Sequence, residues 1–209
     1  MIRSLIYDAL FRPLTARWYA EVLTRLPDRS HLLDVGVGTA GALTHNAALV
    51  RDKQLHVTGI DIDDEYMKRA RERVTKAGLH DNVTLTLESV YDHVGGPYDA
   101  VYFSASFMLL PEPEEALRHV SALLKPEGRI FFTQTFSERR SRLLEIAKPL
   151  LIKITTIDFG RVTYEEDFVR SLRESGLHLE ELTVLDVNVG QSFRLAVAAP
   201  GDSARLHDF

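Results

Sequence analysis

The sequence contains no cysteine among its 209 residues. This absence excludes disulfides, thiolate metal sites and cysteine nucleophiles, and it favours a reducing compartment. Long apolar runs are also absent: Arg3 and Asp8 interrupt the first stretch, MIRSLIYDALF, and no segment approaches the roughly 20 apolar residues of a membrane span. The net charge of −5 gives no general attraction to nucleic acid. We therefore expect a soluble, cytoplasmic protein without a metal site.

Short apolar strands alternate with amphipathic helices along most of the chain. The strand-like segments are 31–36, 55–61, 82–89, 98–106 and 129–136, and then 179–187 and 192–199. The helical segments are 2–26 with an interruption at Pro13, then 42–50, 63–78, a helix opened by Pro113, and 163–176. This alternation predicts an α/β fold, a doubly wound Rossmann-like sheet of about seven strands with helices on both faces. We expect it to be mostly parallel with an antiparallel C-terminal hairpin, in a single domain over 1–209.

Several local signals predict where these elements begin and end. Asp63 or Asp64 can cap the helix over 63–78, and a glycine stops it. Thr163 and Glu166 form a capping-box pattern at the start of the last helix. The stretch KPEG predicts a turn ahead of the fifth strand. The tail GDSARLHDF is predicted to fray.

Three glycines follow the first strand, Gly36, Gly38 and Gly41, with the spacing G-x-G-x-x-G. Such a loop lets backbone N–H groups approach a ligand at a helix N-terminus, although glycine-rich turns also serve packing alone. Asp61 ends the second strand, where a carboxylate can accept both hydroxyl hydrogens of a ribose. Together these features predict a site for an adenosine-containing cofactor.

Asp34, at the mouth of the first strand, distinguishes between two such cofactors. NAD carries a pyrophosphate, whereas S-adenosylmethionine carries a cationic sulfonium and a cationic α-ammonium. An acidic side chain attracts the cations and repels the pyrophosphate. The loop therefore favours S-adenosylmethionine, and an NAD(P)-dependent oxidoreductase is the alternative.

From about Leu32 to Ala199 the sequence resembles the class I S-adenosylmethionine-dependent methyltransferases, close to their general small-molecule group. The similar blocks are LLDVGVGTAG, VTGIDIDDEYMKRAR, NVTLTLESV and the segment from YDAVYFSAS to GRIFF. The resemblance implies S-adenosyl-L-methionine as the cofactor and methyl transfer to a small-molecule acceptor at oxygen, nitrogen or sulfur. The cofactor-binding residues that it implies are Asp34, Gly36, Gly38, Thr39, Gly41, Asp61, Ile62, Ser89, Val90 and Ser104.

The sequence departs from the family pattern at three places. Ser89 stands where an acidic residue commonly contacts the adenine amino group, and Glu88 is an alternative for that contact. Met108 and Leu109 stand where many relatives carry histidines. The asparagine-proline-proline-aromatic signature of several amino-group methyltransferases is replaced by SASF. These departures leave open a methyltransferase-fold binding protein without catalysis.

The acceptor side is less defined, and no catalytic residue is assigned. The candidate general bases are His45, Tyr91, His93 and His119, and we interpret the histidines as surface residues. The residues predicted to contact the substrate are Tyr7, Tyr19 and Phe107, the first two from an N-terminal helical cap over 1–28.

The most individual segment is a variable insert over 137–162, which the resemblance implies to be a substrate lid. It combines a series of leucines and isoleucines with several arginines and lysines. Such a segment suits a lipophilic or anionic acceptor, or association with a membrane surface. The alternatives are a helix that covers the sheet and a contact between the two copies of a homodimer.

Overall fold

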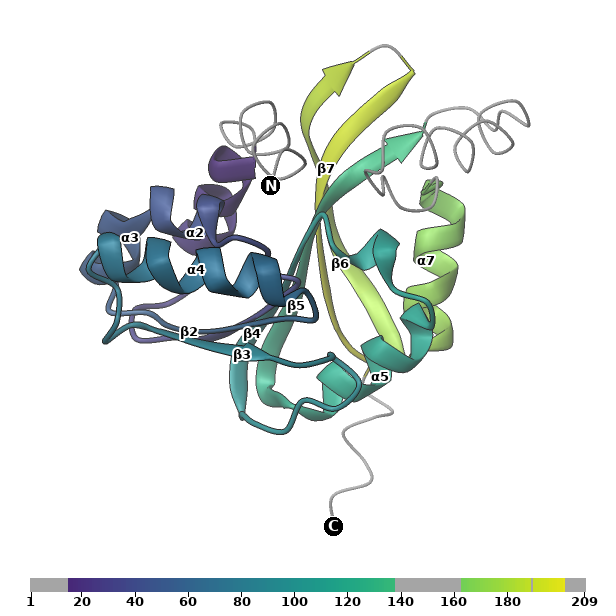
Figure 1. The fold of residues 1–209 in the computed structure, drawn as a ribbon. Helices are drawn as coiled ribbons and strands as arrows, with labels where there is room; N and C mark the ends of the chain where they lie inside the picture. The colour runs from purple at the N-terminus through teal and green to yellow at the C-terminus, as the bar shows by residue number, and fades with distance from the viewer. Residues whose placement is uncertain (1–14, 138–162, 189, 202–209) are drawn as a thin grey trace.

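The computed structural model describes residues 15–137, 163–188 and 190–201, and its centre is a seven-stranded sheet (Figure 1). The strands are β1 (His31–Val35), β2 (His56–Asp61), β3 (Val83–Leu87), β4 (Tyr98–Ser104), β5 (Leu124–Ser137), β6 (Leu177–Asn188) and β7 (Gln191–Pro200). Their order is β3-β2-β1-β4-β5-β7-β6. Strands β1 to β5 are parallel, whereas β7 pairs antiparallel with both β5 and β6. The predicted parallel sheet with an antiparallel C-terminal hairpin is therefore confirmed.

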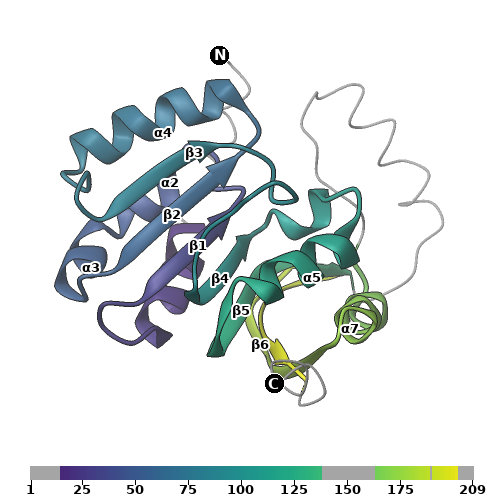
Figure 2. The ribbon, with the colours of Figure 1, turned by 90° about the horizontal axis from the view of Figure 1, so that it is seen from below.

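Helices cover both faces of the sheet, as predicted (Figure 2). One face carries the helix over 15–25 with α2 (Gly41–His45), α3 (Ala47–Asp52) and α4 (Asp64–Lys76). The other carries α5 (Pro113–Ala122), α7 (Glu165–Glu174) and the short 3-10 helix η1 (Phe107–Leu109). Each face has its own apolar cluster, because successive strand residues point to opposite sides. Leu32 and Tyr102 lie in the first cluster, and Leu33 and Phe103 in the second.

The helix predicted over 42–50 is divided in two at Asn46. The side-chain amide of Asn46 donates hydrogen bonds to the carbonyl oxygens of Ala42 and Ala16, at 2.8 and 2.9 Å. The second bond ties the break to the preceding helix. A sequence pattern with helical spacing does not reveal this long-range contact.

The turn predicted at KPEG is replaced by a wide irregularity inside β5. Tyr98 pairs with Leu124 and Ala100 with Arg129, so residues 125–128 face Asp99 alone across the strand pair. Lys125 reaches both carboxylate oxygens of Asp99 at 2.8 Å. The strand therefore starts five residues before the predicted one.

Both predicted ends of α4 are confirmed, whereas at α7 the stop at Gly176 is confirmed and the predicted capping box is wrong. Asp63 caps α4 by accepting a hydrogen bond from the backbone N–H of Tyr66. At α7 the N-cap is Tyr164, with no side-chain capping bond, so the predicted box led by Thr163 does not form. The carbonyl of Thr163 instead accepts from the N–H of Ser137, which pins this residue to the end of β5.

Some predictions fall outside the described residues. These are Tyr7 and the remainder of 1–14, the insert over 138–162, and the tail over 202–209. In the described residues, no helix is long and apolar enough to cross a membrane.

Candidate functional site

The glycine loop lies at the carboxyl end of β1 and turns sharply beside β2. Gly36 and Gly38 adopt positive φ angles of 75° and 58°. The N–H groups of Gly36 and Val37 both donate to the carbonyl of Ile60, at 2.8 and 3.1 Å. A Cβ added at Gly36 would lie 2.6 Å from the Cβ of Ser106. Glycine is therefore required at Gly36 by both backbone conformation and space.

The far side of this loop is braced by Arg73 of α4. Its guanidinium donates to the hydroxyl of Thr39 at 2.5 Å. A Cβ at Gly41 would come within 2.8 Å of the same guanidinium. This contact joins the loop to α4 and fixes where α2 begins.

Asp34 is the most unusual group at this end of the sheet. Its side chain is 1% exposed, and its Oδ2 accepts a hydrogen bond from the hydroxyl of Tyr19 at 2.7 Å. Its Oδ1 is buried and has no hydrogen-bond partner. Burial raises the pKa of Asp34 to about 7, the Tyr19 bond opposes this rise, and the negative charge of Asp61 adds to it. A buried, half-satisfied carboxylate is prepared for a hydrogen-bonding cation.

A pair of buried hydroxyls, those of Tyr102 and Thr133, lies next to Asp34. Tyr102, on β4 opposite Asp34, shares a 2.6 Å hydrogen bond with Thr133 of β5. Its ring meets that of Tyr19 edge-on, with centroids 5.1 Å apart. Burial raises the pKa of both tyrosines, so both hydroxyls stay protonated at neutral pH. Tyr19 was predicted to contact substrate, but in the structure its hydroxyl donates a hydrogen bond to Asp34.

Asp61 lies at the carboxyl end of β2 with its carboxylate held over the glycine loop. It accepts from the N–H of Gly38 and from the N–H of Asp63, each at 2.9 Å. Burial raises its pKa, and the two backbone bonds oppose that rise. The next residue, Ile62, is 77% exposed. A fixed carboxylate beside an exposed aliphatic side chain matches the two halves of an adenosine, its ribose hydroxyls and its base.

The end of β3 differs from what the sequence suggested for Glu88 and His93. Glu88 Oε1 lies 2.6 Å from His93 Nδ1, and His93 Nε2 lies 2.9 Å from the hydroxyl of Tyr98. His93 is 4% exposed, so its interpretation as a surface residue is wrong. The neighbouring Ser89 accepts a long 3.3 Å bond from the N–H of Tyr91. Glu88 therefore points toward His93, while Ser89 stays at the strand end.

The remaining candidate bases are also engaged in structural contacts or exposed. The hydroxyl of Tyr91 donates to the carbonyl of Glu112 and accepts from its N–H. His119 Nε2 lies 2.8 Å from the carbonyl oxygen of His93. His45 is exposed at the end of α2. Val90, predicted in the cofactor site, is 5% exposed within the second apolar cluster.

Ser104 ends β4 on the same strand face as Tyr102, and the chain then turns through Ala105 at φ 54°. Ser106 donates its hydroxyl hydrogen to the carbonyl of Val35, which joins this turn to the end of β1. Phe107 follows and packs in an aromatic cluster with Phe103, Phe132 and Phe168, at centroid distances of 5.1 to 5.9 Å. The predicted substrate residue Phe107 is thus 7% exposed.

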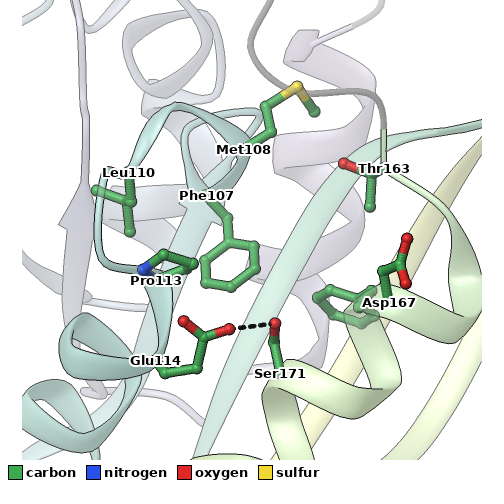
Figure 3. Close-up of a pocket in the computed structure, with 9 residues that line it drawn as sticks. Phe107, Met108, Leu110, Pro113, Glu114, Thr163, Asp167 and Ser171 are labelled. Atoms are coloured by element: carbon green, nitrogen blue, oxygen red, sulfur yellow. Dashed lines mark hydrogen bonds between the residues drawn. The ribbon is translucent and has the colours of Figure 1, made fainter. Parts of the chain in front are cut away.

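A cavity of about 240 Å³ opens beside Phe107, between η1, α5 and α7 (Figure 3). Its described lining residues are Phe107, Met108, Leu110, Pro113, Glu114, Thr163, Asp167, Phe168 and Ser171. Five of these are apolar, two are acidic and none is basic. Glu114 and Ser171 hydrogen-bond to each other at 2.5 Å across its floor. The described part of the lining suits an apolar body.

Sequence reasoning missed the cavity residues of α5 and α7 and the buried amide of Gln134. Gln134 is 1% exposed, and neither its amide nitrogen nor its oxygen has a hydrogen-bond partner. It lies on β5 between Phe132 and Phe136. The sequence signal was an amide side chain within the strand-like run IFFTQTF. The described residues contain no group of three potential metal ligands.

Comparison with known proteins agrees with this geometry. A family described as a methyltransferase domain matches residues 33–130. A ubiquinone biosynthesis O-methyltransferase of Thiobacillus denitrificans is 30% identical over 184 residues, which cover 84% of this chain and 75% of the relative. One of Chromobacterium violaceum is 29% identical over 162 residues, covering 75% and 68%. The crystal structure of the [4+2]-cyclase SpnF has a TM-score of 0.73 at 17% identity, covering 89% of this chain and 81% of that one, and so shares the fold alone.

The fold and these matches define an S-adenosylmethionine-dependent methyltransferase of class I. The chain belongs to that family. Its cofactor is S-adenosylmethionine, and it is an enzyme that transfers a methyl group to a small-molecule acceptor. The alternatives of an NAD(P)-dependent oxidoreductase and of a non-catalytic binding protein are not favoured.

Proposed function

We propose that the carboxyl ends of β1 and β2 bind S-adenosylmethionine and that the chain methylates an oxygen of a neutral, largely apolar acceptor. The observation that carries the cofactor site is the pair of buried carboxylates beside the glycine loop. Asp61 is fixed by two backbone N–H groups, and Asp34 keeps one buried oxygen without a partner. These two groups offer what a ribose diol and an α-ammonium require.

The residues around the loop have separate tasks in this proposal. Asp61 accepts the ribose hydroxyl hydrogens, and the exposed Ile62 covers one face of the adenine. Gly38 leaves open space for the methionine part against the backbone, while Gly36 lets the loop pack closely against Ser106. Ser89, just beyond the end of β3, borders the adenine, the buried Val90 supports that edge from the second apolar cluster, and Ser104 borders the site at β4. Thr39 and Gly41 keep the loop in register through Arg73.

The chemistry requires positioning more than proton transfer by a side chain. The bound cofactor supplies an electrophilic methyl group on a cationic sulfur. The protein's part is to hold the acceptor oxygen in line with that methyl group and to exclude water. Tyr91, His93 and His119 already have hydrogen-bond partners, so no general base is assigned to them. An acceptor hydroxyl that ionises readily, such as that of a phenol, loses its proton to solvent and needs no general base from the protein.

The acceptor class follows from the cavity beside Phe107 and from the relatives. Two ubiquinone biosynthesis O-methyltransferases are named for transfer to oxygen. The described lining of the cavity consists mainly of apolar side chains. An anionic acceptor would lose hydration on entering such a lining, which is unfavourable for a charged group. We therefore favour a neutral phenolic acceptor over the anionic one that residues 137–162 also suggest.

A matched pair of acceptors tests this proposal. The purified chain is assayed with methyl-labelled cofactor and either 4-methylcatechol or 3,4-dihydroxybenzoate, which differ by a methyl group in place of a carboxylate. We expect kcat/KM to be at least about tenfold higher for the neutral compound. A preference for the carboxylated acceptor would contradict the assignment of the cavity.

Three further predictions stay open beside this proposal. A cytoplasmic location, a homodimer and association of the insert with a membrane surface are expectations from the sequence. Separation of cell fractions addresses the first, light scattering the second, and binding to anionic vesicles the third.

A further inference from the structure

The link between the N-terminal helix and the cofactor site is a single buried hydrogen bond. We propose that Tyr19 is a positioning residue for cofactor binding: its hydroxyl holds Oδ2 of Asp34, directs Oδ1 toward the α-ammonium of the cofactor and favours the charged carboxylate. This inference rests on the proposed contact between Asp34 and the cofactor, and it assigns Tyr19 a role other than substrate contact.

The geometry gives Tyr19 this role. Its hydroxyl is 2.7 Å from Oδ2 of Asp34, and the two side chains are 2% and 1% exposed. Asp34 Oδ1 has no partner, so the bond from Tyr19 leaves one oxygen available and defines which one. The ring of Tyr19 is held edge-on against Tyr102. A rotation of the carboxylate would break the Tyr19 bond, so the direction of Oδ1 is fixed before the cofactor binds.

The surroundings of Asp34 explain why a single donor has a large effect. The titratable groups that face it are Tyr19 from the helix over 15–25, Asp61 from the end of β2, and Tyr102 from β4. Both tyrosines are neutral at physiological pH, and Asp61 is negative, so none of these three groups offsets the burial with a positive charge. Burial raises the pKa of Asp34 to about 7, and the Tyr19 bond restrains that rise. A charge-assisted hydrogen bond in a dry site is among the stronger ones.

Cofactor binding is then linked to the ionisation of Asp34. The charged carboxylate binds the α-ammonium, so affinity is full above the pKa of Asp34 and falls as the pH drops below it. Removal of the Tyr19 hydroxyl takes away the bond that favours ionisation. The midpoint of the affinity profile is therefore expected to rise by roughly one to two pH units.

The experiment is calorimetric titration of the full chain with S-adenosylhomocysteine, which carries the α-amino group, from about pH 6 to about pH 9.5. The variants are Tyr19→Phe and Asp34→Asn. The matched control is Tyr102→Phe, which removes a neighbouring buried hydroxyl that bonds Thr133 instead of Asp34. We expect the wild-type midpoint near pH 7, an upward shift for Tyr19→Phe and no shift for Tyr102→Phe. Asp34→Asn should lower affinity at high pH and remove the pH dependence.

The outcomes separate this inference from the proposed cofactor site. Weaker binding of Tyr19→Phe by the same factor at every pH would overturn the role of Tyr19, because lost packing alone gives that result. Unchanged affinity and pH dependence in Asp34→Asn would instead overturn the Asp34 contact itself. If Tyr19→Phe loses the native fold, 3-fluorotyrosine at position 19 replaces it. That residue keeps the ring and is a stronger donor, so the midpoint must move down, and an unmoved midpoint overturns the proposal.

Discussion

The replacement Asp34→Asn is expected to stabilise the cofactor-free protein at neutral pH while it weakens cofactor binding. Asp34 is buried beside the negative charge of Asp61, so its ionisation in the folded state is unfavourable. The rise of its pKa from 3.8 to about 7 means that the folded protein holds this proton more tightly than the unfolded chain does. Folding stability therefore falls as pH rises through that interval. Asparagine has nearly the same shape and does not ionise.

The size of the effect follows from the two pKa values. The penalty in the free energy of unfolding reaches about 4 kcal/mol at pH 8 and about 1.5 kcal/mol at pH 5. Urea unfolding of the wild type and of Asp34→Asn at pH 8 and at pH 5 measures this penalty, provided that the two proteins show the same dependence of the free energy of unfolding on urea concentration. Asp34→Asn should be more stable than the wild type, and by more at pH 8 than at pH 5. An asparagine variant that is less stable than the wild type at pH 8 would refute the reasoning.

Asp99→Asn is the matched control, because this carboxylate has the opposite tendency. Burial would raise the pKa of Asp99, but hydrogen bonds from the N–H of His31 and from Lys125 lower it overall. Its stabilising contribution is present above the pKa of the unfolded chain and is lost as pH falls through the lowered folded value. Asp99→Asn should therefore destabilise at pH 8. Because the pair with Lys125 is partly exposed, the loss should stay within about 1 kcal/mol.

Three further replacements separate stability from binding. Gly36→Ala should lower the free energy of unfolding by roughly 2 kcal/mol more than Gly38→Ala, because an added Cβ meets Ser106 at Gly36 and open space at Gly38. Equal losses of unfolding free energy in the two variants, measured with urea, would contradict this. Ile62→Ala should change the free energy of unfolding by less than about 0.5 kcal/mol, because the side chain is exposed. The same variant should raise the Kd for S-adenosylhomocysteine up to about tenfold. An unchanged Kd would show that Ile62 does not contact the adenine. Phe168→Ala should destabilise by about 3–5 kcal/mol because its ring packs on Phe107 and the rings of β5, and a loss below about 1 kcal/mol would show that the cluster is loose.

The parts of the fold that depend on local chemistry could be predicted from the sequence. The apolar strands, the glycine turn after β1 and the Asp63 cap of α4 each rest on residues a few positions apart. The sequence also predicted that Asp61 does not cap α4, because Asp63 and Asp64 stand closer to the start of that helix. The Asp61 carboxylate accepts from the Gly38 loop, while Asp63 serves the helix.

The wrong predictions at Asn46 and Thr163 involve partners far apart in the chain, whereas the one at His93 involves partners five positions away on either side. Asn46 breaks a helix because it binds the carbonyl of a residue 30 positions earlier. Thr163 does not cap α7 because its carbonyl is held by Ser137 at the end of β5. His93 is buried because Glu88 and Tyr98 enclose it from the two sides of its loop. A pattern of residue types contains no information on such contacts.

The candidate site shows the same division. The sequence identified Asp34 by the charge it would offer a cation, but the bond to Tyr19 and the unpartnered Oδ1 required coordinates. The acidic lining of the cavity was also missed, since Glu114 and Asp167 belong to different helices that only the fold brings together.

Calorimetry tests directly whether Asp61 and the glycine loop bind the adenosyl cofactor. Wild-type protein and Asp61→Ala are each titrated with S-adenosylhomocysteine and with NADH. We expect the wild type to bind S-adenosylhomocysteine and not NADH, and Asp61→Ala to weaken this binding by about 1–3 kcal/mol, as expected for a lost charge-assisted hydrogen-bond pair. Tight NADH binding without S-adenosylhomocysteine binding, or unchanged affinity in a folded Asp61→Ala variant, would contradict it.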